Sequence, residues 1–89
     1  EYYVSIQSEN KSGLYLTAQT DGTVVLAQDV DAAEETAQAQ TFHTMEGLSD
    51  KKGVSFESVL MPGQYLTLQD GKLVLTDGSD KKAATFYLN

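Results

Sequence analysis

The sequence predicts an all-β fold made of two tandem copies of a four-stranded unit. Residues 4–17 align with residues 54–67 without a gap and are identical at seven of fourteen positions, where a composition of this kind gives roughly one match by chance. Residues 22–26 and 71–75 match again after a single deletion. In each half, an Asp-Gly pair separates two runs of alternating apolar and polar residues, which is a strong β-hairpin signal.

Length and repetition together set the domain organisation. A chain of 89 residues is near the lower end of what buries a useful core alone, so it forms one domain at most. We therefore expect a single domain over residues 1–89, with internal repeats over residues 1–45 and 46–89. Four strands in a repeat of this size are typical of trefoil and propeller architectures.

Each unit begins with a strand, predicted at residues 4–8 and 54–60. In the second unit this strand ends before Pro62, which fixes φ and is followed by a glycine that allows positive φ. The hairpin arms follow at residues 65–69 and 72–76, and the first unit repeats them around its own Asp-Gly pair. Each unit then closes on a short strand, at residues 41–44 and 85–88.

One connection breaks the β pattern. Residues 31–40 are rich in helix formers, and Asp31 stands three residues before Glu34, which resembles a capping box. We expect one or two helical turns there. Because the segment is short and has almost no large apolar residue, it is not a core helix but a longer version of the connection at residues 77–83.

Alternation along the hairpin arms assigns their two faces. The side expected in the core carries Leu14, Leu16, Ala18, Val24 and Leu26 in the first unit, and Leu66, Leu68, Leu73 and Leu75 in the second. The opposite side carries Tyr15, Thr17 and Gln19, and their counterparts Tyr65, Thr67 and Gln69. This second, polar and aromatic side is the one expected to meet a ligand.

The chain is acidic, with 6 Lys and Arg against 13 Asp and Glu and a formal charge of −7. Such a surface repels phosphates, so nucleic acid and anionic membrane surfaces are disfavoured as partners. An uncharged carbohydrate fits the charge better. The apolar runs are too short to span a membrane, and the absence of cysteine leaves the compartment open.

The second half also carries a longer motif: GVSFESV at residues 53–59, PGQYL at 62–66, LVL at 73–75, DGS at 77–79 and ATF at 84–86. This run resembles the sugar-binding domain attached to α-L-arabinofuranosidases of the B type, carbohydrate-binding module family 42. Residues 41–48 are similar to that family's linker between repeats, so the resemblance covers essentially the whole chain. It implies a non-catalytic β-trefoil that binds arabinofuranose side chains of arabinoxylan or arabinan.

The chain departs from the resembled family in two ways. That family has three repeats and this chain has two, so we expect an incomplete or variant trefoil. The third unit is cut away or diverged, a second chain supplies it, or the two units close differently. The family also has a histidine and an aspartate associated with sugar binding, at places that hold Ala18 and Leu68, and Ala39 and Ala83, in this chain.

Sugar recognition needs an aromatic ring for stacking and amide or carboxylate groups for the hydroxyls. The candidate ligand-binding residues are Tyr15, Gln19 and Asp21 in the first unit, and Tyr65, Gln69, Asp70 and Asp77 in the second. Two equivalent weak sites on one polymer would add avidity. The alternative is that both tyrosines recur because they pack under a neighbouring strand.

Catalysis and metal binding find little support. His43 is the only histidine and has no serine or cysteine nucleophile motif beside it, so we expect a packed or edge residue. Calcium prefers oxygen ligands, but the spacing of the acidic residues matches no calcium-binding loop. We read those residues, Asp29, Asp31, Glu34 and Glu35, as surface charge and expect no cofactor.

Two functional hypotheses remain. The first is a non-catalytic module of a larger glycan-degrading enzyme, outside the cell or at its surface. It would bind arabinose-containing plant polysaccharide or its oligosaccharides beside a host catalytic domain. The second is a structural or protein-interaction module that keeps the fold without binding sugar.

Overall fold

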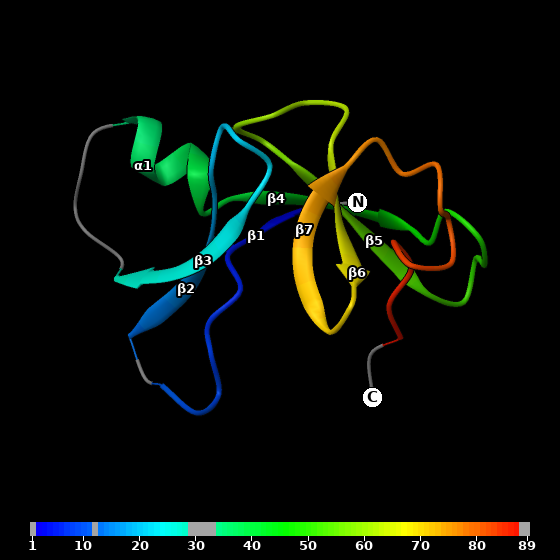
Figure 1. The fold of residues 1–89 in the computed structure, drawn as a ribbon, viewed down its shortest axis with the longest axis horizontal. Coiled ribbons are helices and arrows are strands. Elements are labelled where there is room, and N and C mark those ends of the chain that lie inside the picture. Colours follow the sequence, from blue (N-terminus) through cyan, green and yellow to red (C-terminus); the bar gives the residue numbers. More distant parts are fainter. Residues whose placement is uncertain (1, 12, 29–33, 88–89) are drawn as a thin grey trace.

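The computed structural model describes residues 2–11, 13–28 and 34–87, with the backbone alone for residues 34–36. This part of the chain forms two antiparallel sheets, a five-stranded one with strand order β1-β4-β5-β6-β7 and the two-stranded hairpin β2-β3 (Figure 1). The elements are β1 Tyr2–Val4, β2 Leu14–Ala18, β3 Val24–Gln28, α1 Glu34–Ala39, β4 Phe42–Glu46, β5 Val54–Ser58, β6 Tyr65–Gln69 and β7 Lys72–Thr76. The all-β prediction is confirmed. No helix within the described ranges is long and apolar enough to cross a bilayer.

Both predicted hairpins form, and their turns explain why. In the β6–β7 turn, Asp70 and Gly71 have φ of 50° and 79°. Positive φ at both central residues gives a two-residue turn whose twist matches that of the strands, and Asp-Gly suits it. In the β2–β3 turn, Gly22 has φ of 90°, and the carboxylate of Asp21 accepts a 2.9 Å hydrogen bond from Thr23 N.

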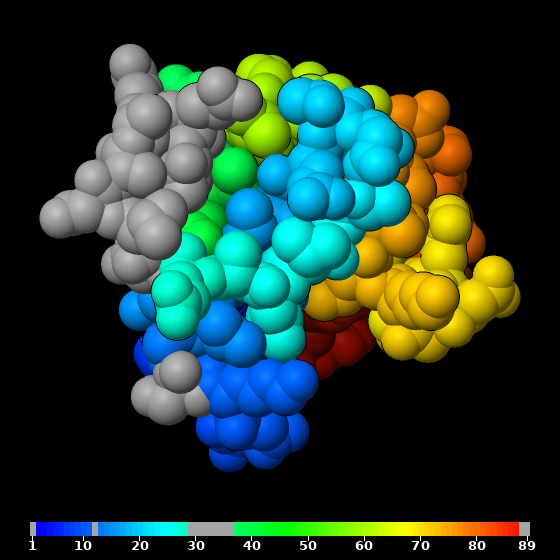
Figure 2. Space-filling view, turned by 60° about the vertical axis from the view of Figure 1, so that its left-hand side comes forward, coloured from blue at the N-terminus to red at the C-terminus, as the bar shows by residue number. Residues whose placement is uncertain are grey.

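The two halves of the chain pack as one body. Strand β4 of the first half pairs with β1 on one side and with β5 of the second half on the other. The two hairpins also meet, because Thr23 forms an isolated bridge with Val74 and Leu75 N donates to Gly22 O at 2.8 Å. Figure 2 shows the first hairpin seated against the second half of the chain.

Backbone hydrogen bonds recur in the two halves at the spacing of the sequence repeat. Ser8 N donates to Leu14 O, and Ser58 N donates to Gln64 O, both at 2.8 Å. Each residue of the second pair lies 50 positions after its counterpart in the first. This agreement supports the division into repeats over residues 1–45 and 46–89, which we keep as a proposal.

The core cluster consists of Ala18, Phe42, Leu66 and Leu75, but the predicted faces fail at three positions. Leu26 and Leu68 were expected inside and are 41% and 51% exposed, whereas Thr67 was expected outside and is fully buried. Alternation along one strand does not include the segments that pack against it. The segment after β7 returns beside β6, where Leu68 N donates to Ala83 O at 2.9 Å. Thr67 can be buried because its hydroxyl donates to Tyr65 O at 3.0 Å and lies 2.7 Å from the hydroxyl of Thr76.

The connections and closing strands follow the prediction in part. The short helix α1 forms where one or two turns were expected, while Asp31 lies outside the described residues. The closing strand of the first unit is β4. In the second unit, the described part of the closing segment makes only an isolated bridge between Phe86 and Val54, with hydrogen bonds of 2.7 and 2.8 Å.

Candidate functional site

The candidate residues of the first unit separate into two places. The hydroxyl of Thr23 lies 2.6 Å from Gln19 Oε1 and 2.6 Å from Asp21 Oδ1, so these groups gather at the turn. Donation by the hydroxyl and the backbone N–H of Thr23 holds the pKa of Asp21 below its usual value. Tyr15 lies four residues before Gln19, which is about 13 Å along an extended strand. One sugar ring therefore cannot reach Tyr15 and this turn together.

The candidate residues of the second unit separate in the same way. Tyr65 begins β6 and pairs with Thr76, which directly precedes Asp77. A Cβ placed on Gly78 would lie 3.0 Å from Tyr65 Cδ1, so the ring lies against the backbone next to Asp77. The structure thus brings Tyr65 and Asp77 together. Gln69 and Asp70 lie at the hairpin tip, about 13 Å further along the strand.

The carboxylate of Asp77 is exposed and already fixed by its turn. Its Oδ1 accepts a 3.0 Å hydrogen bond from Ser79 N. Hydrogen bonds from the backbone and side chain of Ser79 lower the pKa of Asp77 below its usual value. The group is therefore an ionised acceptor at neutral pH, suited to bonding a hydroxyl and unsuited to donating a proton.

Tyr15 and Tyr65, the two tyrosines predicted to bind a ligand, are both half-buried. The aromatic rings that are mostly exposed belong instead to Tyr2, Tyr3 and Tyr87. Reasoning from the repeat selected tyrosines that recur at matching positions, and it missed these three because none has a tyrosine at its matching position in the other unit. The signal available in the sequence was the pair of adjacent tyrosines at residues 2 and 3.

The places where the resembled family carries its histidine and aspartate hold no polar side chain here. In the first unit, Ala18 and Ala39 are both buried. In the second unit, Leu68 and Ala83 are joined by a backbone hydrogen bond. The two places thus lie next to each other in the second unit. Because both hold aliphatic side chains, neither can offer a ligand the side-chain hydrogen bonds of a histidine or an aspartate.

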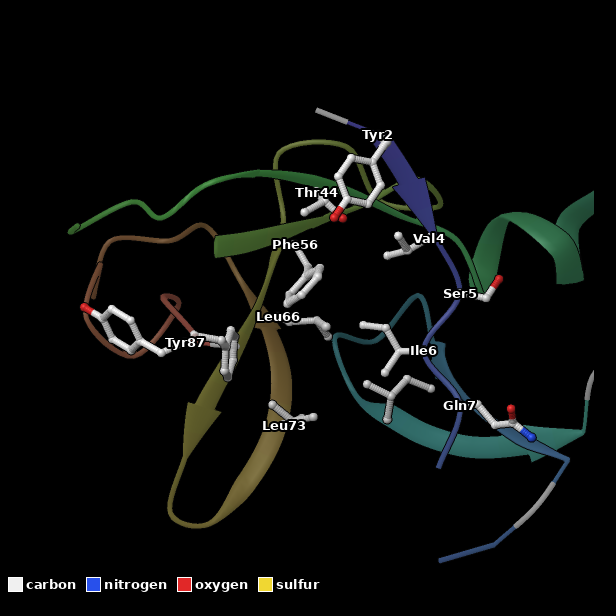
Figure 3. A pocket seen from close by; sticks show the side chains of 12 residues that line it. Tyr2, Val4, Ser5, Ile6, Gln7, Thr44, Phe56, Leu66, Leu73 and Tyr87 are labelled. Atoms are coloured by element: carbon white, nitrogen blue, oxygen red, sulfur yellow. The ribbon is translucent and has the colours of Figure 1, made fainter. Parts of the chain in front are cut away.

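An apolar groove of about 550 Å³ opens between the two halves (Figure 3). Its lining includes the aliphatic and phenyl side chains of Val4, Ile6, Leu16, Phe56, Leu66, Leu73 and Phe86. Ile6 points into the groove, while Ser5 and Gln7 on either side of it point away. This surface suits packing against apolar groups and offers few partners for the hydroxyls of a sugar.

Metal binding gains no support from the described residues. No group of three or more His, Asp or Glu side chains that could hold an ion occurs among them. Of the acidic residues considered for calcium, Asp29 and Asp31 lie outside the described residues, as do the side chains of Glu34 and Glu35.

The chain matches a known protein family along almost its whole length. The family model for the α-L-arabinofuranosidase B (ABFB) domain, AbfB, matches residues 3–89. α-L-Arabinofuranosidase 43 of Humicola insolens is 36% identical over 91 aligned residues, which cover 96% of this chain and 19% of that protein.

Solved structures give the same result. A mutant of a GH54 α-L-arabinofuranosidase soaked with 4-nitrophenyl α-L-arabinofuranoside superposes with a TM-score of 0.82 at 27% identity. An arabinofuranosidase complexed with arabinofuranosyl-α-1,2-xylobiose gives the same two values. Each match covers 96% of this chain and 19% of the other, so the chain spans about a fifth of these relatives.

Proposed function

Because the chain belongs to the AbfB domain family, we propose that it binds arabinose-containing polysaccharide on behalf of a larger glycan-degrading enzyme. AbfB domains are carbohydrate-binding modules and form the small, ancillary, non-catalytic part of GH54 arabinofuranosidases. The match to only 19% of those enzymes leaves their catalytic domain outside this chain. Such a module works outside the cell or at its surface, where the polymer is found.

The observation that carries this proposal is the neighbouring position of Tyr65 and Asp77. The half-buried ring of Tyr65 offers an apolar surface for stacking, and the ionised Asp77 accepts hydrogen bonds from sugar hydroxyls. A net charge of −7 favours an uncharged ligand over an acidic one.

The remaining candidate residues support weaker contacts. In the first unit, Tyr15 is half-buried, while Gln19 and Asp21 are exposed at the turn but already bonded to Thr23. Gln69 and Asp70 are exposed at the tip of the second hairpin. Contacts of this kind add affinity only along a polymer that reaches several places at once.

NMR titration with arabinoxylan and arabinan oligosaccharides tests the proposal, with unsubstituted xylan fragments as the control for arabinose. We expect the ring signals of Tyr65 and the backbone signals of Asp77 to shift. Tyr65→Phe keeps the ring and should keep binding, whereas Tyr65→Ala and Asp77→Asn should weaken it. If no signal of the chain moves at millimolar oligosaccharide, the proposal is wrong.

The second candidate is a structural or protein-interaction module, and the apolar groove is the observation that favours it. Leu73 lines this groove, while Leu68 of the same hairpin is exposed outside it. If protein contact is the function and the partner is a second copy, the chain will exceed its monomer mass in solution. Leu73→Asp will then restore the monomer and Leu68→Asp will not. A monomer that binds sugar excludes this self-association.

A further inference from the structure

Three side chains form a row across the first three strands of the large sheet. Tyr3 of β1 is the register partner of His43 in β4, and His43 is the partner of Glu57 in β5. Residues directly opposite one another lie about 5 Å apart on neighbouring strands and share one face. In β4, the flanking residues Phe42 and Thr44 are buried, so the row occupies the outer face, opposite to the core.

The ring of Tyr3 is held in place and yet open to solvent. Its centroid lies 5.1 Å from that of His43, with the two planes tilted by 34°. Tyr3 is 68% exposed. A ring oriented by one neighbour and open over most of its surface is suited to stacking against the C–H face of a sugar.

The carboxylate of Glu57 is positioned beside this ring pair. Its Oε2 accepts a 2.8 Å hydrogen bond from Gly63 N, which fixes the side chain. Its Oε1 lies 3.5 Å from His43 Nδ1. Because a carboxylate oxygen has more than one lone pair, Oε1 can accept a hydrogen bond from a ligand hydroxyl while it lies beside His43. The side chains of His43 and Glu57 are 23% and 25% exposed and remain within reach of a ligand.

A hollow of about 200 Å³ completes the arrangement. It is lined by Tyr3, His43, Glu57, Ser58, Val59 and Pro62. Pockets that enclose drug-sized ligands measure about 300–1,000 Å³, so this hollow takes one small ring from one side. It contains an apolar ring, a carboxylate and an imidazole, which together can meet both the C–H face and the hydroxyls of such a ring.

We propose that Tyr3, His43 and Glu57 form an additional subsite that binds one residue of a neutral saccharide. The inference rests on the proposed function for its ligand class, but none of its residues belongs to the pair Tyr65 and Asp77. An acidic sugar is disfavoured, because Glu57 would face its carboxylate in a chain of net charge −7. Since Tyr65 is the register partner of Glu57 in β6, the row continues to Tyr65, and the subsite adjoins the Tyr65–Asp77 pair on the same face of the sheet.

The single histidine makes the subsite directly observable. Its ring signals are followed by NMR while arabinotriose or xylotriose is added, with trigalacturonate as the acidic probe. We expect the neutral probes to shift the His43 ring and trigalacturonate to leave it unchanged. Tyr3→Ala should weaken the affinity measured at His43 about 2- to 10-fold, the range expected for one stacked ring.

Tyr2→Ala is the matched control. Tyr2 is the neighbour of Tyr3 on the same strand and is also mostly exposed, but it lines the groove on the opposite face. It should leave the affinity at His43 unchanged. Glu57→Gln keeps the shape of the side chain and removes its charge, so it should weaken binding of the neutral probes without unfolding. Melting curves of all three variants identify any loss of fold.

The outcomes separate this subsite from the proposed function. Shifts at Tyr65 with a silent His43, or equal effects of Tyr2→Ala and Tyr3→Ala, overturn the subsite and leave the proposed function standing. Shifts at His43 with a silent Tyr65 keep the subsite and overturn the Tyr65–Asp77 assignment. If the His43 ring responds to trigalacturonate as it does to the neutral probes, the restriction to neutral saccharides is wrong. If no signal shifts with any probe, both the subsite and the proposed function are wrong.

Discussion

The hydroxyl of Tyr87 donates a 2.8 Å hydrogen bond to Asp50 Oδ2, although the two residues are 37 positions apart in sequence. The other oxygen of Asp50 accepts a 3.0 Å hydrogen bond from Lys52 N within the loop between β4 and β5. The Tyr87 bond therefore ties the segment after β7 to the loop that joins the two halves of the chain.

This pair predicts a shifted tyrosine titration. The hydrogen bond to Asp50 raises the pKa of Tyr87 above its ordinary value of 10.0, and burial and the charge of Asp50 add to the effect. We expect Asp50→Asn to bring the pKa of Tyr87 back toward 10.0. Absorbance of tyrosinate as pH rises measures the change, and the step that disappears in Tyr87→Phe is the one that belongs to Tyr87. If that step is unchanged in Asp50→Asn, the assignment is wrong.

The same bond predicts where stability depends on pH. The pKa of Tyr87 is raised on folding, so its contribution is complete below pH 10.0 and is lost as pH rises through the folded value. The pKa of Asp50 is lowered by its bonds from Lys52 and Tyr87, so that contribution is present above pH 3.8 and is lost as pH falls through the folded value. The difference in Tm between wild type and Tyr87→Phe should be constant between these limits and shrink beyond each. A difference that peaks inside the window would refute this linkage.

Ser55 predicts a stability difference between matching positions of the two units. Its buried hydroxyl donates to Ala84 O at 2.6 Å and accepts from Leu48 N at 3.0 Å. Ser55→Ala should reduce the free energy of unfolding by about 1–3 kcal/mol, because buried backbone groups lose their partner. Ser5, at the matching position of the first unit, is exposed, so Ser5→Ala should change stability by less than about 0.5 kcal/mol. Urea unfolding measures both, and equal losses would argue against the buried bonds.

Leu66 and Leu68 provide a second matched pair on one strand. Leu66 is 2% exposed within the core, and Leu68 is 51% exposed. Leu66→Ala should cost about 2–5 kcal/mol through lost burial and the cavity left behind, while Leu68→Ala should cost less than about 0.5 kcal/mol. If the two variants have comparable unfolding midpoints, Leu66 and Leu68 are equally buried, as the alternation of apolar residues predicted, and the difference in burial described above is wrong.

Local chemistry was sufficient to predict the hairpins and the short helix. The turn around Asp70 and Gly71 and the helix formers of α1 act over a few residues, so their structures can be read from short windows of sequence. The burial of Thr67 could not be predicted in this way. It depends on contacts made only in the folded chain, where the hydroxyl of Thr67 lies 2.7 Å from that of Thr76 in β7 and the segment at Ala83 lies beside β6.

The site was predicted in part for a related reason. Residues two positions apart on a strand share a face, but residues four apart are separated by about 13 Å. Tyr65 and Gln69 therefore lie on the same face but too far apart to contact one sugar ring together. The structure pairs Tyr65 with Thr76, and this pairing places the Tyr65 ring beside the turn at Asp77 and Gly78. Tyr3 escaped detection because it has no tyrosine counterpart in the second unit.

Gly78 predicts a coupling between the backbone and the candidate sugar site. Gly78 and Gly71 have the same φ of 79°, in the left-handed region that disfavours any side chain. A Cβ on Gly71 would meet nothing within 4 Å, whereas on Gly78 it would lie 2.9 Å from Leu48 Cδ1 and 3.0 Å from Tyr65 Cδ1. Gly71→Ala should therefore cost only the backbone strain, about 1–2 kcal/mol, and leave the ring signals of Tyr65 in place.

Gly78→Ala carries the same backbone strain, and in addition it pushes the Tyr65 ring away from the backbone beside Asp77. It should destabilise the chain more than Gly71→Ala does, shift the ring signals of Tyr65, and weaken arabinan oligosaccharide binding measured at that ring. Urea unfolding and NMR titration of the two variants distinguish these effects. Equal destabilisation with an unmoved Tyr65 ring would show that the ring does not depend on Gly78, and the geometry assigned to the Tyr65–Asp77 site would then be wrong.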